Sequence, residues 1–315
     1  MATVNRNRAV VERKPRSRGL SRQRRQEALW GIACVAPALL GFLIWQLGPI
    51  IASLLIAFTD WNIAGTPEWI GLQNFERMFA QDPLFWQSLR VTAVYTLGSV
   101  PLSIVFAFFL AILLNQKVRG LAIFRTIFYL PSIVPVIAAS VLWLWLFNPD
   151  FGLLNAAADL LHLPRSQWIY GEGSVIPSLI LMSLWAVGPM MIIFLAGLQG
   201  VPRQLYEAVD VDGGNALHKL WHITIPMVTP TILFNLVLSI IGTMQTFTQA
   251  YVMTQGGPNN GSLFFVLYLY RKAFQESDMG YASALAWVLF ILIAILSFLV
   301  LRTSSRWVYY EGGAS

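Results

Sequence analysis

The chain has 315 residues, of which 57% are hydrophobic and only 11% are charged, and its formal net charge is +6. A soluble domain of this length does not bury so much apolar surface in one core. These proportions exclude an ordinary soluble protein and predict one that resides in a lipid bilayer.

Six apolar runs without Asp, Glu, Lys or Arg follow a basic N-terminal arm at 1–27. Each run is long enough to cross about 30 Å of hydrocarbon as a helix. Prolines inside the runs, such as Pro101 and Pro135, are tolerated in membrane helices and predict kinks. The sequence therefore predicts an all-α membrane protein with six transmembrane helices in one domain at 28–303, followed by a tail at 304–315. The predicted spans are about 28–59, 91–116, 126–148, 173–200, 220–255 and 281–301.

Basic residues are divided unequally between the two sides that alternating spans define. Sixteen Lys and Arg, nine of them in the arm, fall on one side, and five fall on the other. Basic residues near span ends are retained in the cytoplasm, which predicts cytoplasmic N- and C-termini. The arm has no interleaved aromatic residues and no nucleic-acid-binding module, so we expect it to orient the chain at anionic lipid and to bind no nucleic acid.

The three segments on the opposite side, at 61–86, 149–170 and 255–279, mix aromatic and polar residues. Tryptophans such as Trp61 and Trp86 suit the bilayer interface. In the last segment, the Gly, Pro and Asn residues at 256–261 predict a turn, and 263–274 predicts a short helix along the membrane surface.

The segment between the fourth and fifth spans, 201–226, has the strongest pattern in the chain. Pro202 suits the first turn of a helix, and Gly213 and Gly214 suit the left-handed geometry that ends one. Asn215 is a favoured cap for a following helix. The pattern predicts two short helices about a glycine corner, with acidic and apolar groups exposed. A plain surface connection is the alternative interpretation of such a loop.

The order of residues in this segment resembles the coupling loop of ABC importer permeases. That family's Glu-Ala-Ala, Asp-Gly and Ile-x-Leu-Pro pattern is matched at 207–209, 212–213 and 223–226, with Val209, Gly214 and Ile225 as mild departures. Further strings resemble the carbohydrate importers of the maltose type within this family. They lie at 58–61, 71–75, 128–131, 147–149, 195–199, 254–258 and 279–284.

This resemblance implies the type I importer permease fold in a bacterial or archaeal inner membrane, with a carbohydrate as substrate. It implies three partners: a second related permease, a dimer of ATP-binding subunits that uses ATP and Mg, and an extracytoplasmic solute-binding protein. No catalytic, cofactor or metal site is expected in the chain itself. The resemblance assigns ATPase coupling to Glu207, Ala208, Asp212, Gly213, Trp221 and Pro226.

An ion-coupled secondary transporter of a polar solute is the main alternative. Such transporters usually place an ionisable relay inside the membrane, whereas the six runs hold none apart from His222 near a span end. Na⁺ coupling through carbonyl oxygens stays open. The chain also lacks the phosphate loop of an ATPase, since 214–219 has neither the second glycine nor the hydroxyl.

Polar residues recur along the fifth predicted span at steps of four and three, which places them on one helical face. Sugar hydroxyls need paired donors and acceptors beside flat aromatic surfaces, such as Trp185, so this face is a predicted substrate pathway. The alternative is hydrogen bonding between helices, with Gly242 at a close approach. The predicted pathway residues are Asn235, Ser239, Gly242, Thr246, Gln249 and Tyr251.

Overall fold

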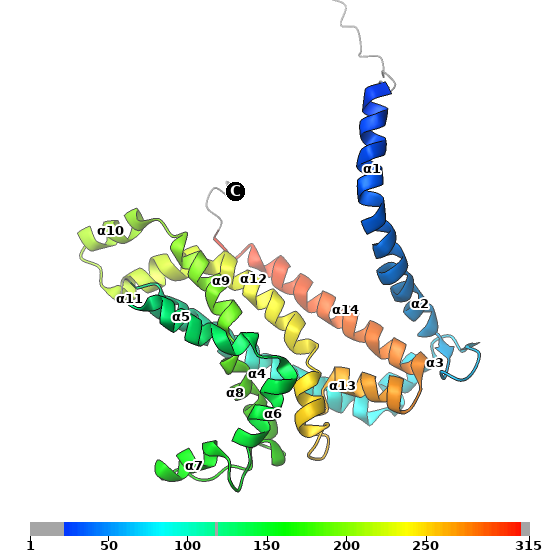
Figure 1. Cartoon of the computed structure of the whole chain (residues 1–315). Coiled ribbons are helices and arrows are strands. Elements are labelled where there is room, and N and C mark those ends of the chain that lie inside the picture. Colours follow the sequence, from blue (N-terminus) through cyan, green and yellow to red (C-terminus); the bar gives the residue numbers. More distant parts are fainter. Residues whose placement is uncertain (1–21, 117–118, 310–315) are drawn as a thin grey trace, which may run out of the picture. The chain divides into compact units, whose positions relative to one another are not determined.

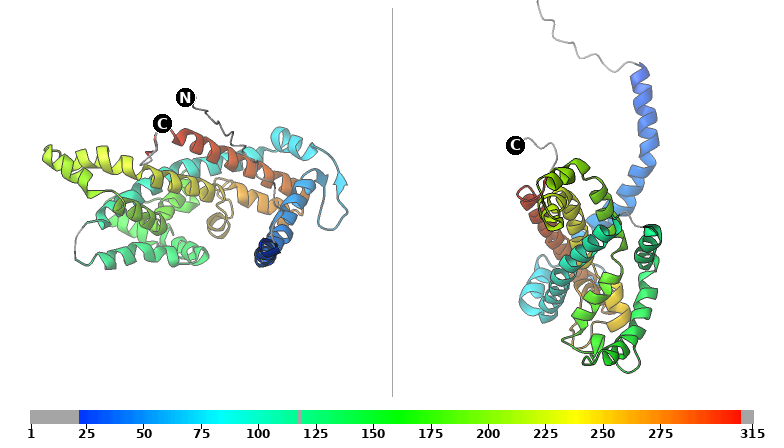
Figure 2. Two further views of the ribbon diagram at one scale, coloured as in Figure 1. Left: turned by 90° about the horizontal axis from the view of Figure 1, so that it is seen from above. Right: turned by 90° about the vertical axis from the view of Figure 1, so that its left-hand side faces the viewer.

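The computed structural model describes residues 22–116 and 119–309, which are largely helical. Residues 1–21 of the predicted arm and 310–315 of the predicted tail lie outside the described residues. The chain divides into two compact units, Met1–Ser53 and Leu54–Ser315. Figures 1 and 2 show the elements of each unit.

The first unit contains α1 (Arg22–Phe42), the π-helical turn η1 (Leu43–Leu47) and the start of α2 (Gly48–Ile56). Helical residues Arg25–Ile56 are long and apolar enough to cross a membrane, and none of their most apolar window is buried. The first predicted span is therefore a helix. It begins at Arg22 rather than at 28, because Arg and Gln are good helix formers.

The second unit begins with the end of α2, continues through a hairpin of two-residue strands and reaches the long helix α4 (Pro83–Leu114). This helix contacts α8, α9, α12 and α13. Asp82 caps α4, since its Oδ1 accepts from the backbone N–H groups of Leu84 (2.9 Å) and Phe85 (3.3 Å). This cap starts the helix at Pro83 rather than at the predicted 91. The elements before α4 are β1 (Thr59–Asp60), β2 (Glu68–Trp69), α3 (Gln73–Glu76) and η2 (Arg77–Gln81).

The remaining elements complete a bundle around α4. In chain order they are α5 (Leu121–Tyr129), η3 (Leu130–Ile133), α6 (Val136–Leu146), α7 (Leu153–Leu160), η4 (Trp168–Tyr170), α8 (Val175–Trp185), α9 (Gly188–Gln199), α10 (Arg203–Val211), α11 (Ala216–Lys219), η5 (Leu220–Thr224), α12 (Ile225–Met244), η6 (Ala250–Thr254), α13 (Phe265–Tyr270), η7 (Arg271–Gln275) and α14 (Met279–Ser304). Within this unit, α10 and α11 lie at one end, called here the α10 end, and α3 and α13 lie toward the other, the α13 end (Figure 1).

Two predicted spans are bent pairs of helices rather than single rods. Leu121–Ile133 and Val136–Leu146 meet at 98°, and Val175–Trp185 and Gly188–Gln199 meet at 52°. Proline explains the first bend, because Pro135 has no N–H to donate and stands at the N-cap of α6. With four continuous membrane-length helices among the described residues, counting each pair as one span gives six.

The fifth predicted span, 220–255, is wrong as one continuous helix. The helix runs from Ala216 to Met244 and stops there, and a separate π-helical turn, η6, follows. The second short helix predicted in the 201–226 loop is present as α11, capped by Asn215, but it continues through η5 directly into α12. A helical run of this length gains one hydrogen bond per added residue, which favours continuation over a break.

Two clusters of buried apolar residues hold the second unit together. One gathers near the α13 end and includes Phe85, Phe264 and Tyr281. The other lies toward the α10 end and includes Phe194 and Val228. The C-terminal segment packs against α12 beside the second cluster. Val308 is buried, and the backbone N–H of Tyr309 donates to Thr229 Oγ1 at 2.9 Å.

Candidate functional site

A hollow lies between α4, α8, α9, α12 and the segment that follows α12. It consists of two joined cavities of about 230 and 360 Å³. Tyr95 belongs to the first apolar cluster and Val187 to the second, so the hollow lies where the two clusters meet. The residues that line both cavities are Tyr95, Ser183, Ala186, Pro189, Thr246 and Gln249.

The lining of this hollow is uncharged and sets hydroxyl and amide groups among apolar side chains. The hydroxyl oxygens of Ser99 and Ser183 lie 2.9 Å apart and link α4 to α8. Thr243 Oγ1 donates to the carbonyl of Ser239 at 2.7 Å, which leaves its lone pairs available as acceptors. None of the described residues that line the hollow is Asp, Glu, Lys or Arg. The site therefore suits a neutral solute with several hydrogen-bonding groups.

Five of the six predicted pathway residues line the larger cavity. They are Asn235, Ser239, Gly242, Thr246 and Gln249. Their common orientation does not come from one helix, because α12 ends at Met244. The chain turns at 245–247 and the next helical segment brings Thr246 and Gln249 back to the same hollow.

Tyr251 is the predicted residue that the structure does not bring to the hollow. Its ring stacks on Phe247 at a centroid distance of 5.3 Å and meets Tyr270 edge-on at 5.3 Å. The break after Met244 changes the helical phase, which turns Tyr251 toward α13. Trp185, which the sequence suggested as an aromatic surface, does line the smaller cavity.

Gly242 distinguishes between the two interpretations of the polar face. A β-carbon added at Gly242 would meet no atom within 4 Å, so no helix among the described residues approaches it closely. Gly197 shows the contrast, because an added β-carbon there would come within 2.5 Å of Thr231 Oγ1. Within the described residues the alternative of a close helix approach has no support at Gly242, and open space in the cavity lies beside this glycine.

Sequence reasoning missed the α4 wall of the hollow. Tyr95, Ser99 and Ser103 line the larger cavity and recur at steps of four. This is the spacing that identified the polar face of the fifth span, so the same test applied to 91–116 finds them. Ser183 on α8 has no such partners along its own helix and could not be found this way.

The second candidate region is α10 and the corner that follows it. Gly213 has φ +75°, and the backbone N–H of Gly214 donates to the carbonyl of Val209 at 2.8 Å. Asn215 Oδ1 then accepts from the backbone N–H of His218 at 2.9 Å, which confirms the predicted cap. Lys219 forms an ion pair with Asp210 across the corner. The corner is thus closed by backbone, cap and charge contacts together.

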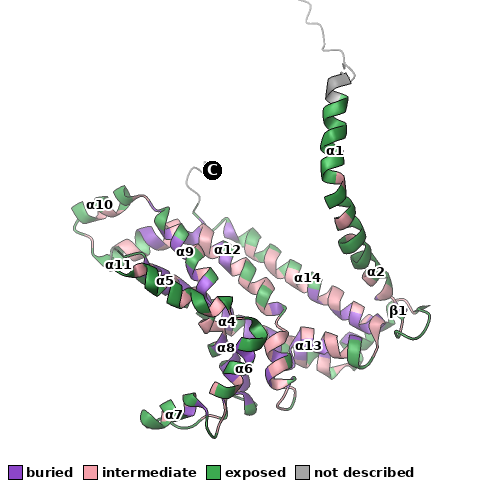
Figure 3. Cartoon of the chain, viewed as in Figure 1, coloured by how far each residue is buried: buried purple, intermediate pink, exposed green. Residues whose placement is uncertain are grey.

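The predicted coupling residues lie on or beside this corner at the α10 end. Glu207, Ala208, Asp212, Gly213 and Trp221 are exposed, and Pro226 is half-buried at the start of α12. Tyr206 and Val209 are the residues of α10 that pack on the second apolar cluster. Figure 3 shows α10 mostly in the colour of exposed residues.

Large apolar side chains stand among the acidic ones on this surface. Val211 is 88% exposed, Leu217 64% and Trp221 63%. Glu207 and Asp212 have no ion pair with any described residue. A projecting surface that combines free carboxylates with exposed aliphatic and aromatic groups is typical of a protein docking site.

At the α13 end, Asp82 joins three helices. Its carboxylate caps α4 and accepts hydrogen bonds from the hydroxyls of Tyr268 on α13 and Tyr281 on α14. Partial burial alone raises the pKa of Asp82, but the hydrogen bonds from the two tyrosines and from the α4 backbone outweigh it and hold the pKa below its ordinary value. Arg77 lies 4.4 Å from the centre of the Tyr281 ring.

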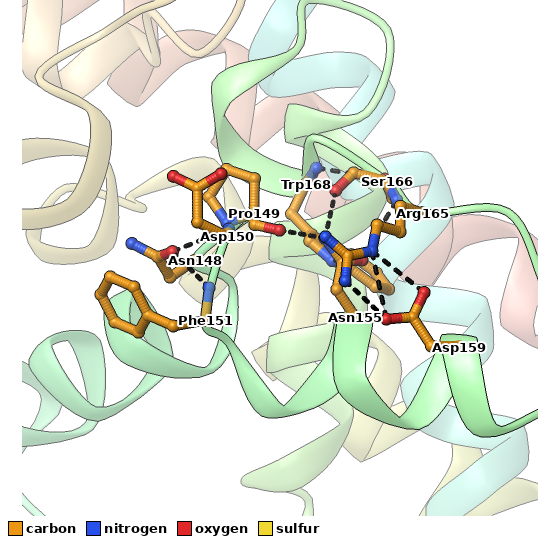
Figure 4. A network of polar contacts seen from close by, with 9 residues as sticks. All are labelled: Asn148, Pro149, Asp150, Phe151, Asn155, Asp159, Arg165, Ser166 and Trp168. Atoms are coloured by element: carbon orange, nitrogen blue, oxygen red, sulfur yellow. Dashed lines mark hydrogen bonds and ion pairs between the residues drawn. The ribbon is translucent and has the colours of Figure 1, made fainter.

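The loop that contains α7 is ordered by one buried amide (Figure 4). Asn155 Nδ2 donates to the carbonyls of Pro149 (2.9 Å) and Ser166 (3.0 Å), and Asn155 Oδ1 accepts from Trp168 Nε1 at 2.8 Å. Because every hydrogen-bonding group of this side chain is engaged, the 149–168 segment is a defined structure rather than a loose linker.

Comparison with known proteins identifies this fold. Residues 99–309 match the family described as binding-protein-dependent transport system inner membrane component. The chain belongs to this family. This permease is therefore a membrane component of a binding-protein-dependent transport system, and the family resemblance of its sequence is confirmed.

Relatives of the permease match along most of their length. The probable ABC transporter permease protein YesP of Bacillus subtilis is 42% identical over 92% of this chain and 95% of YesP. The arabinooligosaccharides transport system permease protein AraP of the same organism is 33% identical, with 85% and 86% covered. A chain in the crystal structure of a bacterial ABC transporter involved in the import of the acidic polysaccharide alginate superposes with a TM-score of 0.78 at 22% identity, covering 90% of this chain and 96% of that one. This likeness shows the type I importer permease fold.

Proposed function

We propose that the permease forms half of the translocation pathway of an ATP-driven importer for a carbohydrate. The observation that carries this proposal is the uncharged hollow lined by serine, threonine, asparagine and glutamine side chains beside Tyr95 and Trp185. Hydroxyl and amide groups pair with sugar hydroxyls, and flat aromatic rings pack on sugar faces. The relative AraP, an arabinooligosaccharides transport system permease protein, supports the same substrate class.

In this proposal, ATP hydrolysis by partner subunits is coupled to transport through α10. A dimer of separate ATP-binding subunits binds and hydrolyses ATP with Mg, and one of these subunits docks on the α10 corner. The free carboxylates of Glu207 and Asp212 and the exposed Trp221 are the contacts it would use. Since α11 continues without a break into α12, a push on the corner acts on the helix that lines the hollow.

The remaining assembly follows from the same proposal. A second, related permease supplies the other half of the pathway, and a solute-binding protein delivers the carbohydrate at the α13 end. The N- and C-termini and α10 face the cytoplasm, because most Lys and Arg residues fall on that side. Bilayer lipid surrounds the remaining apolar surface.

Uptake by reconstituted vesicles tests this function. The full transporter is placed in proteoliposomes with ATP and Mg on the α10 side and labelled oligosaccharide with the binding protein on the other. We expect uptake that requires ATP and persists when ionophores collapse all ion gradients. Uptake that needs a Na⁺ or H⁺ gradient and ignores ATP would instead favour the ion-coupled alternative.

A further inference from the structure

A second hollow, of about 460 Å³, lies near the α13 end between the start of α4 and the start of α8. One wall is formed by Gln87, Arg90, Val91 and Val94 of α4. The residues of the other wall are Glu172, Gly173, Ile176, Pro177 and Ile180, and Asn259 and Gly261 complete the lining. None of these residues lines the candidate pathway, so the groove is a separate site.

Both ends of this groove are closed by defined contacts. At the outer end, Gln87 Nε2 donates to the carbonyl of Asn260 at 3.3 Å, and Asn259 Nδ2 donates to Glu172 Oε1. The turn at 259–261 is thereby tied to both walls. At the other end α4 and α8 touch, since a β-carbon added at Gly98 would come within 2.5 Å of Ile180 Cδ1.

Polarity changes along the groove in one direction. On α4, residues 87, 90, 94 and 97 lie on one helical face, and they read Gln, Arg, Val and Leu from the α13 end inward. On the other wall, Glu172 and Gly173 precede Ile176 and Ile180. The distance from residue 90 to residue 98 is about 12 Å at the rise of an α-helix. An amphiphile with a polar head and an apolar tail fits this gradient, since the end beyond Val94 offers no hydrogen-bonding side chain for a sugar hydroxyl.

The polar end of the groove carries one charge of each sign. Arg90 is exposed and has no hydrogen bond or ion pair with any described residue. Glu172 is exposed, and its only described partner is the neutral amide of Asn259. A phosphate group would pair with the guanidinium of Arg90, and a primary ammonium would pair with the carboxylate of Glu172.

We propose that this groove binds one phospholipid whose headgroup is a zwitterion with a primary amine, as in phosphatidylethanolamine. Its phosphate contacts Arg90, its ammonium contacts Glu172, and its acyl chains leave over Val94 and Leu97, which are 50% and 76% exposed. In the orientation of the proposed function this lipid belongs to the outer leaflet. The leaflet assignment rests on that proposal, but the binding itself does not.

Native mass spectrometry of the full-length chain measures this binding without ATP or substrate. The delipidated protein is titrated in detergent with phosphatidylethanolamine, phosphatidylcholine and phosphatidylglycerol that have identical acyl chains. We expect one phosphatidylethanolamine to be retained with an affinity about three- to tenfold above that of either other lipid, the gain of one charge-assisted hydrogen bond. Phosphatidylcholine has no N–H to donate to Glu172, and phosphatidylglycerol has no ammonium.

Single substitutions test the roles of the two charged side chains in lipid binding separately. Arg90→Gln should lower retention of all three lipids, whereas Glu172→Gln should remove the preference for phosphatidylethanolamine while leaving phosphatidylglycerol binding unchanged or stronger. Val94→Trp, which fills the apolar part and touches neither charge, should lower retention of all three. Arg306→Gln is the matched control, because Arg306 is also exposed but lies after α14, away from the groove.

Three results would overturn the proposal. The first is equal retention of the three lipids that Arg90→Gln and Glu172→Gln leave unchanged. The second is displacement of the lipid by an oligosaccharide, which would make the groove a solute site. The third is protection of Arg90 from solvent by the partner permease in the assembled transporter, which would make it a protein interface. Loss of transport in the vesicle experiment, by contrast, leaves the lipid measurement unaffected.

Discussion

Gly214 lies against Val209 so closely that a β-carbon added to the glycine would come within 2.3 Å of Val209 Cγ1. Its neighbour Gly213 is required for another reason, since it has φ +75° with no atom within 4 Å of an added β-carbon. Gly214 is therefore needed because a side chain has no space there, and Gly213 is needed for its backbone geometry. Between them they set the angle at which α10 stands against α12.

Replacement of Gly213 tests whether this angle matters for coupling. Gly213→Ala places an L-residue in left-handed geometry at a local cost of about 1 kcal/mol, which is too small to unfold the chain. We expect ATP hydrolysis to continue while uptake per ATP falls. Gly71→Ala is the matched control, because Gly71 also has a positive φ (+63°) and free space but lies toward the α13 end. Equal ratios of uptake to hydrolysis in both variants would contradict the proposed role.

The carboxylate of Glu207 is the second test of the α10 surface. Glu207→Gln keeps the shape and removes the charge, and we expect a transport rate about tenfold lower, the effect of losing one charge-assisted hydrogen bond of roughly 1.5 kcal/mol. The permease should still enter the membrane, because the residue is exposed and has no described ion-pair partner. Glu68→Gln, an exposed control on β2, should transport normally. Normal coupling in Glu207→Gln would contradict the proposal that the Glu207 carboxylate contacts the ATP-binding subunit.

Gln249 provides the sharpest test of the polar lining. Gln249→Ala should raise the KM for the carbohydrate about fivefold, the loss expected for one neutral hydrogen bond of about 1 kcal/mol, and Thr246→Ala should act in the same direction. Gln245→Ala is the control, since Gln245 is the same residue type four positions away and is exposed outside the lining. Identical KM values for the two glutamine variants would indicate that the polar face has only a structural role.

Asp82 predicts a dependence of stability on pH. Its pKa is depressed in the folded protein, so its contribution to stability is present above the unfolded value of about 4 and is lost as the pH falls through the folded value. The midpoint temperature of thermal unfolding of the wild type should therefore decrease below about pH 4. Asp82→Ala should lose about 1–2 kcal/mol at pH 7 and show a weaker decline in acid. An Asp60→Ala control should follow the wild type, and a parallel decline in Asp82→Ala would contradict the assignment.

Much of this fold could be predicted from local signals. The apolar runs are longer than a soluble helix needs, and Asn215 and the glycine corner carry their own turn chemistry, so both were recognisable without tertiary information. Helix ends were harder. The early start of α4 has a local signal in Asp82 and Pro83, but this signal lies before the uncharged run that was used to place the span.

The candidate pathway was predicted only in part, because helical periodicity assumes an unbroken helix. Asn235, Ser239 and Gly242 precede the end of α12, and their common face is a property of that helix. Thr246 and Gln249 reach the same hollow by a turn of the chain, and the same turn takes Tyr251 away. Ser183 reaches the site by packing of α8 against α4, where its hydroxyl meets that of Ser99, and no periodic pattern along α8 predicts this contact.

Gly242 allows the most direct test of the central claim that carbohydrate passes through the hollow between α4 and α12. A side chain at this position points into open space, so Gly242→Trp should fill the cavity without a clash with a neighbouring helix. Gly31→Trp on α1, where an added β-carbon also meets nothing, is the control for insertion of a large residue in a helix. In the ATP-dependent vesicle assay, we expect Gly242→Trp to assemble with its partners and hydrolyse ATP while carbohydrate uptake is abolished. Uptake at the rate of Gly31→Trp would contradict the account.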